Sequence, residues 1–254
     1  MQNNLQKASF WKRIAAWMFD SIVISIIVVG VAFLLSYIFA YDSYLSTVTN
    51  AYERYEAEFG VDFDISAEDY EKLSPTELEK YHMADEALNS DDEAIQAYNM
   101  AVNLSLIIVT IALLVGVMLW EFILPLIFGN GQTLGKKIFG IFLVRPNCVK
   151  ISRLQIFVRS LLGKFTVETM IPAYIVLMLI WGVLNFFGLL IFAILFVVQA
   201  VLLIANENRP LLHDIIAVTV VADASSTRTF ESEHELIEYK KARHVDEVSK
   251  KGYF

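Results

Sequence analysis

The chain has 254 residues, of which 56% are apolar and 19% charged, and its mean hydropathy is +0.53. This composition exceeds what the core of a soluble domain needs, so it excludes an ordinary water-soluble protein and predicts an integral membrane protein. Because the formal charge is −8, we expect no nucleic-acid partner. The single cysteine, Cys148, excludes an intramolecular disulfide.

The first predicted element is a membrane span at about residues 14–40. Residues 21–40, SIVISIIVVGVAFLLSYIFA, carry no charge, and as a helix they can cross a hydrocarbon layer of about 30 Å. A secretory signal peptide has an apolar region of only about 7 to 15 residues, so we expect an uncleaved anchor. Asp20 then lies at the inner edge of the span, with Arg13 on the same helix face about 10 Å away.

Residues 41–98 are predicted to form an acidic, helical, extracytoplasmic insertion. Residues 41–100 contain three basic and 16 acidic side chains, a formal charge of −13. The motifs SAED at 66–69 and SPTE at 74–77 are typical of helix N-termini, and SDDE at 90–93 is expected to begin a helix that continues into the second span. A solvated face and a surface that recruits cations or a basic protein both explain the acidic charge.

Three further spans are predicted. The second lies at about residues 99–128 and is interrupted by Glu121 near its end. Residues 169–206 carry no charge and are too long for one crossing, so a reversal at residues 182–188 predicts spans at about 166–183 and 187–206. Because 17 of the 20 basic residues lie outside residues 41–100, the positive-inside rule places both termini in the cytoplasm.

The segment between the second and third spans is predicted to lie on the cytoplasmic face. Residues 137–152, KIFGIFLVRPNCVKIS, predict a β-hairpin, to which residues 215–223 could add a strand. Residues 152–165 predict an interfacial amphipathic helix with Arg153, Arg159 and Lys164 on its polar surface. The stretch GNGQTLGKK has Asn130 where a phosphate-binding loop needs its first glycine, so we expect no nucleotide site there. Residues 223–254 form a charged cytoplasmic tail, expected to be a solvated helix or disordered, with a partner-docking helix as the alternative.

Acidic and basic residues fall together at the predicted inner edge of the membrane. The acidic residues are Asp20, Glu121, Glu168 and Asp214, and the basic ones are Arg13, Lys136, Lys137, Arg159, Lys164 and Arg209. One interpretation is an ion-pair network that holds the helices, the hairpin and the interfacial helix together. The other is a site that exchanges a cation or a proton, with Asp20 and Asp214 as carboxylate ligands and Glu121 inside the hydrocarbon.

Three blocks of sequence carry a resemblance to a known family. They are RIAAWMFD at 13–20, GQTLGKKIFGIFLV at 131–144 and NRPLLHDIIAVTVV at 208–221. With these blocks the chain resembles the RDD family of bacterial membrane proteins over about residues 8–222, with Arg13, Asp20 and Asp214 as the motif residues. The resemblance implies a bacterial cytoplasmic membrane, and some members look like cation/proton antiporters while others are accessory membrane subunits.

The sequence therefore predicts an all-α membrane protein with four transmembrane helices. A small cytoplasmic β-hairpin or sheet, an interfacial amphipathic helix and an acidic helical extracytoplasmic loop complete the expected fold. The preferred function is a non-catalytic membrane subunit or regulator, whose Arg/Asp residues at the inner interface hold the bundle together. The alternative is a secondary cation/proton transporter that uses Asp20, Asp214 and Glu121.

Further expectations concern chemistry and partners. No serine elbow or zinc-protease motif is present, so we expect no enzymatic activity, no cofactor and no metal site. The expected partners are the lipid bilayer, a protein bound at the acidic loop or the cytoplasmic face, a second copy of the chain, and a monovalent cation.

Overall fold

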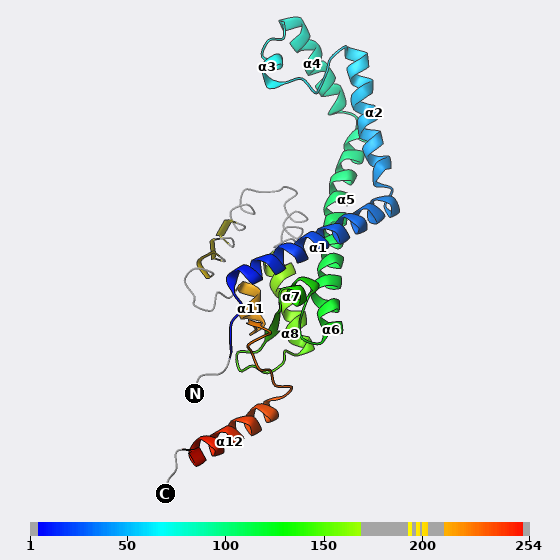
Figure 1. Cartoon of the computed structure of the whole chain (residues 1–254). Coiled ribbons are helices and arrows are strands. Elements are labelled where there is room, and N and C mark those ends of the chain that lie inside the picture. Colours follow the sequence, from blue (N-terminus) through cyan, green and yellow to red (C-terminus); the bar gives the residue numbers. More distant parts are fainter. Residues whose placement is uncertain (1–4, 169–192, 195–196, 199, 203–210, 251–254) are drawn as a thin grey trace. The chain divides into compact units, whose positions relative to one another are not determined.

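The computed structural model describes residues 5–168, 193–194, 197–198, 200–202 and 211–250, and Figure 1 shows their secondary structure. The chain divides into two compact units, residues 29–112 and residues 1–28 together with 113–254. The described part is mostly helical and contains one two-stranded sheet. The predicted spans at 166–183 and 187–206 lie largely outside the described residues.

Among the described residues, two continuous helical stretches are long and apolar enough to cross a membrane. They are α1, Phe10–Ile38, and the stretch Asp92–Phe128, and both have a mean hydropathy of 2.6. On α1 the apolar Ile22 and Ile26 are 60% and 67% exposed, whereas Asp20 is only 3% exposed. A surface that is apolar while a carboxylate is buried is the arrangement expected of a helix surrounded by lipid.

The unit of residues 29–112 contains a small helical lobe. Its helices are α2 (Tyr41–Phe59), α3 (Ala67–Tyr70), α4 (Pro75–Leu88) and the first part of α5 (Asp92–Val117). Ser66 and Ser74 cap α3 and α4, which confirms the two predicted N-termini. Ala51, Leu88 and Ala94 form the buried core of the lobe, against which Tyr55 and Phe63 pack.

Asp91 directly precedes α5 and caps it, within the SDDE motif that predicted the start of this helix. Its carboxylate accepts hydrogen bonds from the backbone N–H groups of Glu93 (3.0 Å) and Ala94 (3.1 Å) and pairs with Arg54 of α2. The Ala94 N–H and the Arg54 guanidinium hold the pKa of Asp91 below its usual range. One side chain therefore caps α5 and ties it to α2.

The second unit contains the remaining short elements. They are η1 (Met118–Ile123), α6 (Leu124–Phe128), α7 (Leu134–Ile138), β1 (Ile141–Val144), α8 (Arg153–Phe157), η2 (Val158–Glu168), α11 (Leu212–Ile216), β2 (Val220–Asp223) and α12 (Glu233–Lys250). Its core contains Ala16 of α1, Ile141 and Leu143 of β1, and Val221 of β2. The first long helix and both strands thus meet in one core.

The sheet contains the first arm of the predicted hairpin and the strand predicted within residues 215–223, but not the second arm of the hairpin. β1 is antiparallel to β2, with Ile141 opposite Asp223 and Val144 opposite Val220. The second arm of the predicted hairpin is wrong as a strand, because it makes only the isolated bridges Val144–Lys150 and Val149–Phe230. Ser152 ends this arm by capping α8, so the segment is too short to form a ladder with β1.

The segment predicted as an interfacial helix is helical, but one of its charged side chains lies elsewhere than predicted. Residues 153–168 are helical, as α8 followed by the π-helix η2, but Arg159 is 3% exposed while Leu154 is 69% exposed. The placement of Arg159 on a polar surface is therefore wrong. Its guanidinium turns inward because the carboxylate of Asp214 lies in the core beside it.

The C-terminal tail contains the helix α12. Leu236 and Tyr239 at its start pack on Phe230, Cys148 and Val149. The following turns are exposed, so the tail is a helix that is anchored at its first turns and solvated beyond them.

Replacing Asp91 with alanine is expected to loosen the first turn of α5. The N–H groups of Glu93 and Ala94 lose their acceptor, and Arg54 loses its partner. Hydrogen–deuterium exchange of the purified protein should then be faster in the peptide that contains residues 92–96. The matched control is Asp92→Ala, next to the cap and exposed. Equal exchange rates in the two variants would contradict this role of Asp91.

Candidate functional site

Asp20 is held by three donors from outside its own helix. Its Oδ1 accepts hydrogen bonds from the indole N–H of Trp120 (2.8 Å) and from the backbone N–H of Gly135 (2.9 Å), and its Oδ2 accepts from the hydroxyl of Thr133. Thr133 also caps α7 through a bond from the N–H of Lys136. The buried carboxylate of α1 therefore lies at the N-terminus of α7 and is stabilised there by uncharged donors.

Gly135 makes this approach of α1 and α7 possible. A Cβ atom at position 135 would lie 2.5 Å from the carbonyl oxygen of Ala16 and 2.8 Å from Oδ1 of Asp20. Both distances are shorter than a van der Waals contact, and the first involves backbone that cannot move aside easily. The glycine therefore serves a close contact between two helices.

Glu121 forms a second buried group. Its Oε2 lies 3.4 Å from Nζ of Lys136, and its Oε1 accepts a hydrogen bond from Lys164 of η2. Burial lowers the pKa of Lys136 to about 8, although Glu121 acts in the opposite direction. One carboxylate thus joins η1 to α7 and η2 through two ammonium groups.

The backbone around Glu121 is adapted to this contact. In an α-helix the carbonyl of Glu121 would accept from the N–H of residue 125, but Pro125 has no N–H. The hydroxyl of Ser160 donates to this carbonyl at 2.5 Å instead. Ser160 is fully buried, so the hydrogen bond fastens η2 to the second apolar helical stretch.

Asp214 forms the third buried group, with two arginines. Its Oδ1 accepts a hydrogen bond from Nη1 of Arg159, and its Oδ2 accepts from Nη2 of Arg13 at 3.3 Å. Nη1 of Arg159 also donates to the hydroxyl of Thr219 at 3.0 Å. Burial acts to raise the pKa of Asp214, but Arg159 and Arg13 outweigh it and keep the pKa well below its usual range. The carboxylate of α11 is therefore an anion that joins α1 to η2.

His213 extends this group to Glu168. Its Nε2 lies 2.9 Å from Nη2 of Arg159, and its Nδ1 lies 2.5 Å from Oε1 of Glu168. A guanidinium can only donate, so Nε2 must accept and the proton of the neutral ring sits on Nδ1. Burial and Arg159 lower the pKa of His213, in agreement with a neutral ring. Gly163 permits the packing, because a Cβ there would lie 2.6 Å from Cβ of His213.

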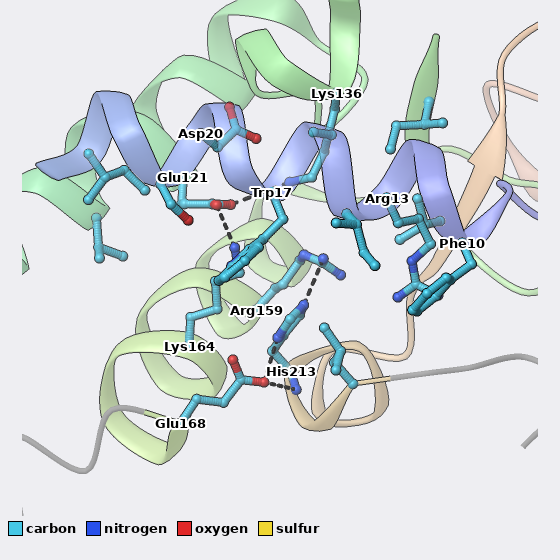
Figure 2. Close-up of a pocket in the computed structure, with 18 residues that line it drawn as sticks. Phe10, Arg13, Trp17, Asp20, Glu121, Lys136, Arg159, Lys164, Glu168 and His213 are labelled. Atoms are coloured by element: carbon cyan, nitrogen blue, oxygen red, sulfur yellow. Dashed lines mark hydrogen bonds and ion pairs between the residues drawn. The ribbon is translucent and has the colours of Figure 1, made fainter. Parts of the chain in front are cut away.

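A pocket of about 590 Å³ lies within this unit, next to the three groups. Its basic lining residues are Arg13, Lys136, Arg159 and Lys164, and its acidic ones are Asp20, Glu121 and Glu168. Figure 2 shows Arg159, His213 and Glu168 following one another in a chain of contacts, with Glu121 and Lys164 nearby. Most other lining residues are apolar, among them Ile14, Trp17 and Ile24 of α1.

The structure brings together most of the residues predicted for the inner interface. Arg13, Asp20, Glu121, Lys136, Arg159, Glu168 and Asp214 all lie in this cluster, whereas Arg209 lies outside the described residues. The bonds of Asp20 differ from those of the predicted ion-pair network, because its three donors are uncharged. Arg13 pairs with Asp214.

Several site residues were not predicted from the sequence. They are Trp120, Thr133, Gly135, Ser160, His213 and Thr219. A signal existed for four of them, since Thr133 and Gly135 belong to the block at 131–144 and His213 and Thr219 to the block at 208–221. Among the residues that the structure describes, no group of three or more His, Cys, Asp or Glu side chains could hold a metal ion.

These features define a class of protein. Long apolar helices and buried carboxylates bonded between helices describe a membrane protein whose short helices are tied to its first long helix. A model of the RDD family matches residues 7–218, so the chain belongs to the RDD family. The match includes Arg13, Asp20 and Asp214. Comparisons with curated proteins and with solved structures gave no significant match.

Replacing Gly135 with alanine is expected to lower the free energy of unfolding by about 1–3 kcal/mol, the usual cost of overpacking. The new methyl group would collide with the carbonyl of Ala16 and push Asp20 away from its donors. Gly30→Ala is the matched control, because a Cβ there meets nothing within 4 Å and alanine favours a helix by about 1 kcal/mol. Unfolding in detergent, followed by circular dichroism, compares the two. Equal stability of both variants would show that the contact is not needed.

The stability of the protein is expected to fall as the pH drops below about 6.5, the ordinary pKa of histidine. Because the pKa of His213 is lowered in the folded state, the unfolded chain takes up this proton first. The loss is at most about 1.4 kcal/mol per pH unit. Arg159, Asp214 and Glu168 face the ring.

The test measures the melting temperature between about pH 7.5 and about pH 5.5, the range in which histidine titrates. His213→Gln should flatten the decline, while His234→Gln, at a largely exposed side chain, should leave it unchanged. A decline of the same slope in all three proteins would assign it to other groups.

Proposed function

We propose that the protein is a non-catalytic membrane subunit or regulator, in which the buried charged residues hold the cytoplasmic end of the helix bundle together. One observation carries this proposal: each of Asp20, Glu121 and Asp214 is at most 4% exposed and is bonded to donors from other elements. Together these three carboxylates connect α1 with η1, α7, η2 and α11. Such connections stabilise a fixed arrangement.

The same bonds argue against these carboxylates as exchangeable ligands. An ion carrier must release the groups that bind its ion, but Asp214 is paired with two arginines and Glu121 with two lysines. Breaking a buried ion pair by removing one partner costs about 3–5 kcal/mol. A transport cycle that frees these carboxylates would have to overcome a free-energy cost of this order at every turnover.

The proposed topology has four spans in a bacterial cytoplasmic membrane, with both termini in the cytoplasm. It is supported by the two apolar helical stretches, by the uncharged residues 169–206 and by the distribution of basic residues. Residues 41–98, with their acidic charge, then lie outside the cell.

Two surfaces are proposed to contact partners. One is the acidic lobe, which suits a basic protein, and the other is the cytoplasmic face with α12. On α12, Ile237, Val245 and Val248 are 50%, 66% and 45% exposed. A protein partner or a second copy of the chain could cover these apolar residues.

A second candidate function is proton-coupled transport of a monovalent cation through Asp20, Glu121 and Asp214. It is favoured by Lys136, whose pKa of about 8 lies close to neutral pH and whose ammonium group faces both Glu121 and the pocket. A lysine of this kind can take up and release a proton in the physiological range.

Proteoliposomes that contain the wild-type protein distinguish the two functions. We expect no cation-dependent proton flux above that of empty liposomes, and we expect Asp214→Asn to lower the free energy of unfolding by about 3–5 kcal/mol, because Arg159 stays buried without the carboxylate that it binds. Asp62→Asn, in the exposed lobe, is the matched control.

Flux in the wild type that is lost in a stably folded Asp20→Asn variant would replace the proposal by the transport function. For the subunit role, a partner should copurify with the full chain and be lost when residues 45–95 are deleted. A single component in both purifications would contradict a partner at the lobe.

A further inference from the structure

Arg159 has one polar group that the described protein does not satisfy. The side chain is 3% exposed, its Nη1 binds Asp214 and Thr219, and its Nη2 binds His213, but Nε has no hydrogen-bond partner among the described residues. Buried N–H groups are nearly always paired, and leaving one unpaired costs about 1–3 kcal/mol. Because Arg159 lines the pocket, an acceptor bound there can supply the missing bond.

The shape of a guanidinium indicates what this acceptor is. Nε and the neighbouring Nη2 present two parallel N–H groups, the fork that matches two oxygens of a phosphate or carboxylate. Nη2 uses only one of its two hydrogens for His213. The free edge of Arg159 is therefore suited to an oxyanion.

Four basic side chains around the pocket form two ion groups with carboxylates. Arg13 and Arg159 share one carboxylate, Asp214, and Lys136 and Lys164 share another, Glu121. Each of these ion groups contains two cations and one anion.

The two other acids near the pocket have their own donors. Asp20 is bonded to three uncharged groups, and Glu168 accepts from the ring and the backbone N–H of His213. The four basic side chains around the pocket are thus balanced by four carboxylates, and what favours an anion is the free edge of Arg159, where an acceptor can complete a bond that a cation cannot.

The size and lining of the pocket show that the ligand is more than an ion. A volume of about 590 Å³ is in the range of sites for organic ligands, and a single water occupies only about 30 Å³ of liquid. Ile14, Trp17 and Ile24 of α1 supply much of the apolar wall, and Trp17 is 61% exposed on this membrane-type helix. An apolar wall stabilises a hydrocarbon chain and offers nothing to a free phosphate.

We propose that this pocket binds an anionic phospholipid, with its phosphate on the free edge of Arg159 and an acyl chain along the apolar side of α1. Lys164 and Arg13 line the same pocket. This inference does not rest on the proposed function, because a subunit and a transporter can both carry a bound lipid.

The full chain, purified in a neutral detergent, is the material for the test. Phosphatidylglycerol, phosphatidylcholine and glycerol phosphate are added separately, and the melting temperature and the lipid retained in native mass spectrometry are measured. We expect a higher melting temperature and a retained lipid with phosphatidylglycerol. Phosphatidylcholine and glycerol phosphate should give about tenfold weaker binding or less, because each lacks either the net negative charge or the chain.

Two variants keep the result specific to the pocket. Ile14→Trp fills the apolar wall without changing any charged group and should lower retention of phosphatidylglycerol about tenfold, the effect of about 1.4 kcal/mol. Ile22→Trp is the matched control, since it lies on the same helix outside the pocket lining and is 60% exposed. Arg159→Lys keeps the charge but loses the fork, and should reduce the preference for phosphatidylglycerol over phosphatidylcholine.

Three results would overturn the proposal. The first is equal retention of phosphatidylglycerol and phosphatidylcholine. The second is stabilisation by glycerol phosphate as large as that by phosphatidylglycerol, which would make the site one for a free oxyanion. The third is unchanged retention in Ile14→Trp, with the variant folded as shown by circular dichroism. None of these results depends on ion flux or on a copurified partner, so they leave the proposed function to its own test.

Discussion

The arrangement of the residues around the pocket depends on the burial of one guanidinium, that of Arg159. A guanidinium has five N–H groups and no acceptor, and it stays charged when buried, so each neighbour must offer an acceptor. Asp214 and Thr219 offer oxygen atoms, and His213 offers the lone pair of Nε2. The proton of His213 is therefore on Nδ1, where it meets Glu168. The orientation of four side chains from η2, α11 and the segment before β2 follows from this single constraint.

The backbone is adapted to bring these groups close enough to interact. Gly135 and Gly163 lie where a Cβ would touch a neighbouring element at less than 3 Å, so α7 can approach α1 and η2 can approach α11. Pro125 removes the helical donor to the carbonyl of Glu121, and Ser160 of η2 takes its place. The π-helical turns at η1 and η2 carry Glu121 and Arg159 themselves. Local departures from regular helix thus coincide with the buried charges.

The two proposals draw on different features of the same cluster. The carboxylates are fully engaged by protein donors, which supports a role in holding the helices together. Arg159 keeps an Nε–H group without an acceptor among the described residues, which supports an anionic ligand in the pocket. A bound lipid would complete the hydrogen bonding of the buried guanidinium and add a further connection between α1 and η2.

The sequence by itself determined the membrane class, the first two apolar helices, the caps of α3 and α4 and the family, because these depend on composition, on local spacing and on contiguous motifs. It also indicated that Arg13, Asp20 and Asp214 matter. Only the tertiary structure decided that Arg13 pairs with Asp214, that Asp20 is bonded to Thr133 and Gly135, that β1 pairs with β2, and that Arg159 is buried. These contacts join residues far apart in the chain, and a helical pattern read along the sequence places a charged residue on the outer surface unless a distant partner is known.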